Sequence, residues 1–206
     1  MRRRHPRARE VIDSLRVLAV IPARAGSKRV PAKNIRDFRG KPLVQWTLEC
    51  AKQSRYLDVI ACSTDCPTVA LIAWQQGAIV VPRPPELATD TAKSEDVMRQ
   101  VLGLIPADIV VLLQPTSPLR IAEDIDTCVA AMIHSHFQIN ADYVVTVGPD
   151  GKRNGAVYVM DAYSIGRGRN FDKEGLVVTM PAERSLDIDE PEDFTDSPDA
   201  LPGYIS

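Results

Sequence analysis

The chain has 206 residues, of which 45% are hydrophobic, and a formal net charge of −2 at pH 7. No apolar run reaches the roughly 18 residues that a membrane-spanning helix needs, and the length is sufficient for one well-buried core. We therefore expect a soluble protein with no membrane partner, whose single domain covers residues 16–194.

The charge is unevenly distributed along the chain. Residues 1–16 carry six arginines and two acids, so the remainder has a net charge near −6, which argues against nonspecific binding of nucleic acid. Because this leader lacks the apolar core of a secretory signal, we interpret residues 1–15 as a flexible basic extension, although organellar transit peptides can also be Arg-rich. Residues 195–206, rich in Pro, Asp and Ser, are predicted to form a flexible tail.

Short apolar runs alternate with helical patterns through the first half of the chain. The strand-like runs are Val17–Ile21, Val59–Cys62, Ala78–Val81 and Ile109–Leu113. The helical patterns between them are Leu43–Ser54, Pro67–Gln76 and Glu95–Ile105. This alternation predicts an α/β fold whose mostly parallel sheet is covered by helices on both faces, with ligands bound beyond the carboxyl ends of the strands.

The second half continues with a helix and further strands. The expected elements are a helix at Ala122–His136, strands at Tyr143–Val147 and Ala156–Met160 joined by a tight turn at Gly148–Asn154, a strand at Leu176–Met180, and a short helix near Pro191–Phe194. The four cysteines are Cys50, Cys62, Cys66 and Cys128. They lack zinc-finger spacing, so we interpret them as thiols in a reducing compartment and expect a cytoplasmic protein.

The first predicted strand runs into a basic loop, which reads IPARAGSKRVPAKN over residues 21–34. Three of its cations, Arg24, Lys28 and Lys33, surround Gly26 and Ser27, so cations and backbone N–H groups can converge on a polyanion such as a nucleoside triphosphate. A solvated basic loop is the alternative interpretation, but the position at a strand end favours anion binding. The loop is not a Walker loop, because GxxxxGK[ST] is missing.

Two further polar segments follow predicted strands. The first, RPPELATDTAKSED at residues 83–96, contains Ser94, a plausible N-cap of the next helix. The second, QPTSPLR at residues 114–120, begins with Gln114, whose amide both donates and accepts hydrogen bonds and so suits a polyhydroxylated or carboxylate-bearing substrate. Either segment can also serve structure alone, as a capped loop or a turn.

A carboxylate cluster, ERSLDIDEPEDF, covers residues 183–194. Asp187 and Asp189 alternate around Ile188, so in an extended backbone both carboxylates face the same side and can share Mg²⁺. Acidic turns are common, but a triphosphate needs a metal ion to neutralise its charge, and no other carboxylate pair in the sequence is as well formed. The sequence therefore predicts a magnesium site here.

Five segments of the chain, in this order, resemble the acylneuraminate cytidylyltransferases, the CMP-sialic acid synthetase family. They are IPARAGSKRVPAKN, RPPELATDTAKSEDV, LQPTSPLR, NGAVYV and MPAERSLDIDEPEDF, and they cover most of residues 16–194. The resemblance implies a Rossmann-like α/β nucleotidyltransferase that takes CTP and Mg²⁺, joins CMP to a nonulosonic, sialic-acid-like acceptor, and releases pyrophosphate. The related octulosonate cytidylyltransferases share the fold in outline, but their opening loop looks different.

The resemblance also implies roles for individual residues. The residues implied to bind the nucleotide are Ala23, Arg24, Gly26, Ser27, Lys28, Lys33, Asn34, Arg83 and Ser94. Those implied to bind the acceptor are Gln114, Thr116 and Ser117, and the metal ligands are Asp187 and Asp189. We expect in-line attack by an acceptor oxygen on the α-phosphorus, with Arg24, Lys28 and Asp189 carrying the catalytic roles.

The sequence departs from the family pattern between Val147 and Asn154. Members usually carry a long arm here that swaps across a dimer and reaches into the partner's site, whereas this chain has only GPDGKR. We therefore interpret it as a short member without the dimerisation arm, for which a homodimer remains open but an arm-swapped one is not expected. Lys152 and Arg153 are the local cations available instead. The alternatives to a nonulosonate cytidylyltransferase are an enzyme with an octulosonate or small phosphonate acceptor, and a catalytically silent nucleotide-binding module.

Overall fold

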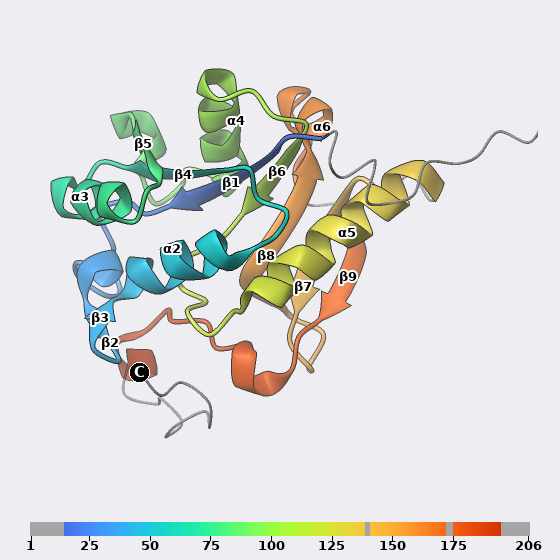
Figure 1. The fold of residues 1–206 in the computed structure, drawn as a ribbon. Coiled ribbons are helices and arrows are strands. Elements are labelled where there is room, and N and C mark those ends of the chain that lie inside the picture. The colour runs from blue at the N-terminus through green and yellow to red at the C-terminus, as the bar shows by residue number, and fades with distance from the viewer. Residues whose placement is uncertain (1–14, 139–140, 172–174, 195–206) are drawn as a thin grey trace, which may run out of the picture.

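The computed structural model describes residues 15–138, 141–171 and 175–194. Across these residues the main element is a seven-stranded sheet in the order β5-β4-β1-β6-β8-β7-β9 (Figure 1). The strands are β1 (Val17–Pro22), β4 (Val59–Thr64), β5 (Ile79–Pro82), β6 (Ile109–Leu112), β7 (Tyr143–Val147), β8 (Arg153–Asp161) and β9 (Leu176–Thr179). The strands pair in parallel except at β8, which runs antiparallel to both β6 and β7.

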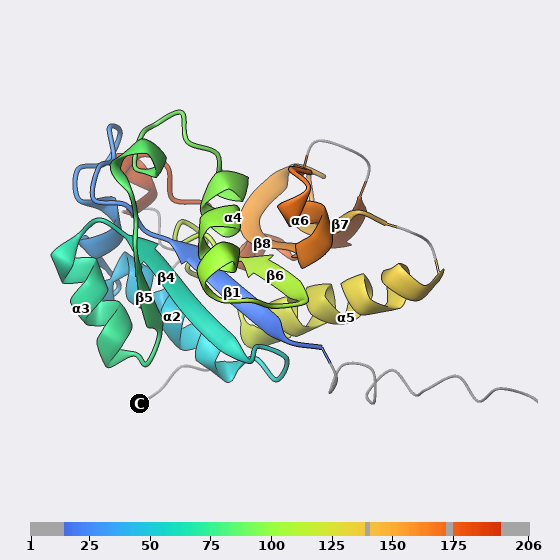
Figure 2. The same cartoon turned by 90° about the horizontal axis from the view of Figure 1, so that it is seen from above.

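Helices cover both faces of this sheet, as Figure 2 shows. One face carries α2 (Leu43–Gln53), α3 (Pro67–Gln75) and α5 (Ala122–Gln138), and the other carries α4 (Ser94–Leu104) and α6 (Ala162–Gly166). Strand β1 shows why helices are needed on both faces, because its side chains alternate between the two faces of the sheet. Val17 and Ala19 pack in the cluster that includes α2 and α5, whereas Leu18 and Val20 pack in the cluster that includes α4. The predicted fold class is confirmed.

Each strand and helix expected from the sequence is present, with ends shifted by a few residues. Three features were not expected. Helix α6 begins after Asp161, whose side chain accepts a hydrogen bond from the Ser164 amide. A small hairpin forms from β2 (Asp37–Phe38) and β3 (Lys41–Pro42). Ser94 is the first residue of α4 rather than its N-cap, and the capping position, Lys93, makes no side-chain cap.

Four 3₁₀ turns complete the described elements, and all four lie in or overlap the polar segments identified in the sequence. They are η1 (Lys33–Ile35), η2 (Pro85–Leu87), η3 (Ala182–Arg184) and η4 (Pro191–Phe194). Apart from Leu15, the basic extension and the tail predicted from the sequence lie outside the described residues. Within those residues, none of the helices combines the length and the apolar character required to span a membrane.

The segment after β9 returns across the molecule to the β2–β3 hairpin, where η4 lies (Figure 1). Its anchor is Ile188, which is fully buried in a small cluster with Phe38, Leu43 and Leu119. The amide of Ile188 also donates to the main-chain oxygen of Thr116 at 2.7 Å. This packing brings the carboxylate cluster of the sequence next to the first basic loop.

Candidate active site

A cleft of about 560 Å³ opens at one edge of the sheet. Its walls come from the loop after β1, the segment between β5 and α4, and the residues after β6. Because β1, β5 and β6 run in the same direction, all three segments follow carboxyl ends of strands, where α/β sheets bind ligands. The predicted nucleotide-binding residues that line it are Arg24, Gly26, Ser27, Lys28, Lys33, Asn34, Arg83 and Ser94.

The remaining predicted residue of that set, Ala23, is fully buried beneath the cleft. Its main chain is tied to the end of β4, because its amide donates to the Ser63 carbonyl at 3.0 Å and its carbonyl accepts from Thr64 Oγ1 at 2.5 Å. Asn34 Nδ2 donates to the carbonyl of Arg24 at 2.9 Å. Asn34 therefore both lines the cleft and fixes the course of the loop.

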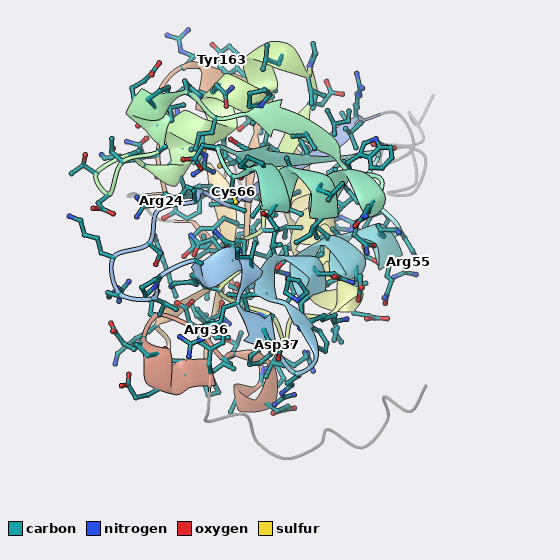
Figure 3. All side chains as sticks on the ribbon, turned by 90° about the vertical axis from the view of Figure 1, so that its left-hand side faces the viewer. Arg24, Arg36, Asp37, Arg55, Cys66 and Tyr163 are labelled. Carbon is teal, nitrogen blue, oxygen red and sulfur yellow. The ribbon has the colours of Figure 1, made fainter. Side chains whose placement is uncertain are left out.

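Two cations of the loop, Arg24 and Lys28, are paired with one carboxylate across the cleft. Arg24 Nη2 lies 2.5 Å from Asp90 Oδ1, and Lys28 Nζ lies 2.6 Å from Asp90 Oδ2. Arg24 Nη1 also donates to the carbonyl of Ala88 at 3.1 Å. Figure 3 shows Arg24 where the first loop meets the segment that follows β5. The hydrogen bonds from Lys28 and Arg24 lower the pKa of Asp90, so this carboxyl is ionised at neutral pH.

Lys33 lies deeper and joins the loop to the carboxylate cluster. Its Nζ donates to the main-chain oxygen of Ile188 at 2.7 Å and lies 3.1 Å from Asp189 Oδ1. Arg29, which sequence reasoning missed, pairs with the same Asp189 at 3.1 Å and with Glu190 at 2.9 Å. Burial alone would raise the pKa of Asp189, but the hydrogen bond and charge of Lys33, aided by Arg29, lower it overall.

Asp187 is in a different environment from Asp189. Its Oδ1 is buried and is without a hydrogen-bond partner in the described part of the chain, and burial raises its pKa. An orphaned carboxylate oxygen fits a cation ligand. No cluster of three or more His, Cys, Asp or Glu side chains suitable for a metal occurs among the described residues. Because Mg²⁺ usually takes one or two carboxylates and completes its shell with water and phosphate oxygens, the pair Asp187 and Asp189 fits that ion.

Two of the predicted acceptor residues, Gln114 and Ser117, lie next to the predicted metal ligand Asp187 at Gly155, which has a positive φ of 70°. A Cβ at this position would lie 2.9 Å from Gln114 Oε1, 3.3 Å from Ser117 Oγ and 3.6 Å from Asp187 Oδ1. Segments far apart in the sequence therefore converge on a glycine whose missing side chain leaves them room. Ser117 is almost completely buried and donates to the Asn154 carbonyl at 2.8 Å, which holds the strand start in place. Thr116 lines the cleft with Gln114.

Two buried arginines donate hydrogen bonds to the main chain of the segments that form the site. Arg83 lines the cleft, donates to the carbonyl of Ser63 at 3.0 Å, and has its pKa lowered to about 10 by burial. Arg120, another residue that sequence reasoning missed, is 3% exposed. Its guanidinium donates to the carbonyls of Gln114 and Ala156 and, at 2.7 Å, to Thr47 Oγ1. Arg120 is the last residue of LQPTSPLR, so its place in that motif is the sequence feature from which its role could have been predicted.

The cations at the short turn between β7 and β8, Lys152 and Arg153, have partners outside the cleft lining. Lys152 is highly exposed and lies 3.6 Å from Asp150. Arg153 donates to the Tyr143 hydroxyl at 3.0 Å and lies over the Tyr143 ring. Neither residue belongs to the cleft lining. In this structure the two local cations therefore do not contribute to the cleft.

Comparison with known proteins gives matches to cytidylyltransferases and to a CMP-sugar synthase. The family model described as Cytidylyltransferase matches residues 18–164. The chain is 35% identical to the CMP-N,N'-diacetyllegionaminic acid synthase of Legionella pneumophila, over 87% of this chain and 94% of that protein. It is 30% identical to the N-acylneuraminate cytidylyltransferase of Escherichia coli, over 87% of this chain but only 50% of that protein. The chain thus spans about half the length of the latter relative.

A solved structure shows the same fold. The CMP:2-keto-3-deoxy-manno-octonic acid synthetase complexed with CTP superposes with a TM-score of 0.70 over 87% of this chain and 95% of that chain. Its sequence identity to this chain is 17%. The likeness at this identity concerns the fold alone.

Proposed function

The chain belongs to the cytidylyltransferase family, a family of nucleotidyltransferase enzymes, and from this premise we propose that it transfers CMP from CTP to a nonulosonic acid and releases pyrophosphate. The observation that supports this most directly is the meeting of two sets of side chains at one sheet edge. Cations for a triphosphate line the cleft, and Gln114 and Asp187 converge beside it at Gly155. A nucleotide and an acidic acceptor can therefore lie next to each other.

In the proposed reaction an acceptor oxygen attacks the α-phosphorus of CTP. A new oxygen–phosphorus bond forms, the bond from the α-phosphorus to the bridging oxygen breaks, and pyrophosphate departs. Arg24 and Lys28 would stabilise the charge on this leaving group. Among the residues that the structure describes, no histidine lines the cleft, so positioning and charge stabilisation carry the proposed catalysis.

We assign the divalent metal to Asp187 and Asp189. When bound, Mg²⁺ would neutralise phosphate charge and lower the pKa of the acceptor hydroxyl. Asp189 would exchange its pairs with Lys33 and Arg29 for the metal, and those cations would then be available to phosphate oxygens. Gln114, held through its carbonyl by Arg120, would orient the acceptor.

The first acceptor to test follows from the relatives. The chain spans 94% of a protein named as a CMP-N,N'-diacetyllegionaminic acid synthase, which supports N,N'-diacetyllegionaminate as the first candidate. The short turn between β7 and β8 supports a site completed within one chain, and we propose that any homodimer forms without an exchanged arm. The free thiols, of which Cys50, Cys62 and Cys128 are buried, support a cytoplasmic location.

The deciding experiment is pyrophosphate release with CTP, Mg²⁺ and a panel of acceptors. The panel holds N,N'-diacetyllegionaminate, N-acetylneuraminate, an octulosonate and a small phosphonate, and Asp187→Asn is the inactive control. Release with a nonulosonate alone supports the proposal. Release only with the octulosonate or the phosphonate would show that the acceptor is not a nonulosonate. CTP binding without release for any acid would favour the silent nucleotide-binding module.

A further inference from the structure

Asp90 lines the cleft and pairs with two cations that we assigned to the nucleotide phosphates. Its two carboxylate oxygens each contact a different cation, Arg24 at 2.5 Å and Lys28 at 2.6 Å. These are the cations assigned above to the triphosphate. The chain therefore supplies its own anion to the phosphate subsite.

Arg24 and the first loop also have anchors other than Asp90. Arg24 is attached to the opposite wall by a second hydrogen bond, from Nη1 to the Ala88 carbonyl at 3.1 Å. Lys28 is 82% exposed and Asp90 34% exposed, so their ion pair is solvated and easily exchanged. The first loop is anchored separately, since the Ala25 amide donates to Asp65 Oδ1 at 2.7 Å.

An exposed ion pair of this kind has a small net free energy, because each charge is also well solvated by water. A triphosphate carries several charges and can contact both cations at once, so it displaces a single carboxylate readily. Pyrophosphate has a similar charge density. When it leaves, the carboxylate is already attached nearby and can take its place on the cations, which favours release.

We propose that Asp90 is an exchangeable counter-ion, which competes with the phosphates of the nucleotide and of pyrophosphate for Arg24 and Lys28. This inference rests on the proposed function. It differs from the pairing of Lys33 with Asp189, because Asp189 is a proposed metal ligand whereas Asp90 has no role in the assigned chemistry. Asp90 keeps the cations paired in the free enzyme and weakens the binding of ligands that reach them.

The test compares dissociation constants for CTP, CMP and pyrophosphate, measured by titration calorimetry on the full chain with Mg²⁺. Asp90→Asn should bind CTP and pyrophosphate about three- to tenfold more tightly than the wild type, as expected when exposed ion pairs no longer compete. CMP lacks the β- and γ-phosphates, so its dissociation constant should change by less than about twofold.

The matched control is Asp96→Asn, which removes one negative charge from the first turn of α4. Asp96 pairs with Arg99 at 2.5 Å and does not line the cleft, so this variant should bind CTP like the wild type. Thermal unfolding of both variants checks that they are folded. Equal or weaker CTP binding by Asp90→Asn, or equal tightening in Asp96→Asn, would overturn the counter-ion role. Absence of CTP binding by wild type and variants alike would overturn the proposed function, and this inference with it.

Discussion

The ammonium group of Lys33 donates a 2.7 Å hydrogen bond to the main-chain oxygen of Ile188, across 155 positions of sequence. Lys33 is only 9% exposed, and the acceptor lies between the two proposed metal ligands. This one contact joins the proposed triphosphate loop to the proposed metal segment. A change at Lys33 should therefore affect stability and activity together.

Lys33→Met keeps the apolar length of the side chain and removes its charge. We expect kcat/KM to fall about a hundredfold, as for the loss of one charge-stabilising contact. Stability should fall by about 1–3 kcal/mol, because a buried carbonyl loses its donor. Steady-state kinetics and urea denaturation measure the two effects. A variant with wild-type kcat/KM would show that Lys33 has no role in the proposed reaction.

Asp187→Asn should separate stability from activity. Its buried Oδ1 has no hydrogen-bond partner among the described residues and burial raises its pKa, so its charge opposes folding in the absence of metal. We expect activity to fall at least about a hundredfold, while stability stays equal or rises, as happens at functional sites under strain. Pyrophosphate release and a melting curve in EDTA test this, and a large loss of stability would contradict it.

The same residue makes a prediction for pH. A raised pKa in the folded state means that protonated Asp187 favours folding, and that this contribution is lost as the pH rises from 3.8, the ordinary pKa of an aspartate, through the raised pKa. In EDTA, Asp187→Asn should therefore gain stability relative to the wild type over that interval. Denaturation midpoints at several acidic pH values give the stability of the variant minus that of the wild type, and a fall in this difference with rising pH would contradict the prediction.

Gly155→Ala should block the acceptor and spare the nucleotide. A Cβ would lie 2.9 Å from Gln114 Oε1, and the positive φ of 70° adds backbone strain of about 1–2 kcal/mol. The acceptor KM should rise at least about tenfold, with CTP affinity unchanged. Gly168→Ala is the matched control, because Gly168 has a φ of 79° but no atom within 4 Å of the added Cβ. It should lose stability only; equal kinetic defects in both variants would refute the steric argument.

Arg120→Lys should be costly for stability, because an ammonium group cannot replace the fork of donors to Gln114, Ala156 and Thr47. We expect a loss of about 2–4 kcal/mol in urea denaturation. The control is Arg55→Lys, since Arg55 is 74% exposed in its pair with Asp126 and should contribute less than about 1 kcal/mol. Similar losses in the two variants would show that burial of Arg120 is not the cause.

The strands of the sheet were predictable because they are continuous apolar runs, and β7 was predicted with its observed bounds. The hairpin of β2 and β3 was not, since each strand has only two residues and no periodicity can show in that length. Helix α6 has five residues, which is also too short for a helical pattern.

The site was predictable as a set of segments but not as a set of contacts. Polar motifs after apolar strands indicated the correct edge of the sheet, and ten of the predicted residues line the cleft, eight of them from the nucleotide-binding set. The partners of Asp90 and Arg29 could not be predicted, because ion pairs between exposed side chains depend on how distant loops fold towards each other. The buried contacts of Arg120 likewise depend on the packing of three separate elements.

The reversed direction of β8 has a consequence for how this enzyme family can diversify. Because β8 runs against β6, its N-terminal part, with Asn154 and Gly155, lies at the same edge of the sheet as the carboxyl end of β6, and so does the turn that joins β7 to β8. A longer segment inserted in that turn would extend over the site without lengthening or shifting any strand. The turn is therefore a point at which the surroundings of the proposed acceptor site could change while the strands that carry the proposed nucleotide-binding loop stay the same.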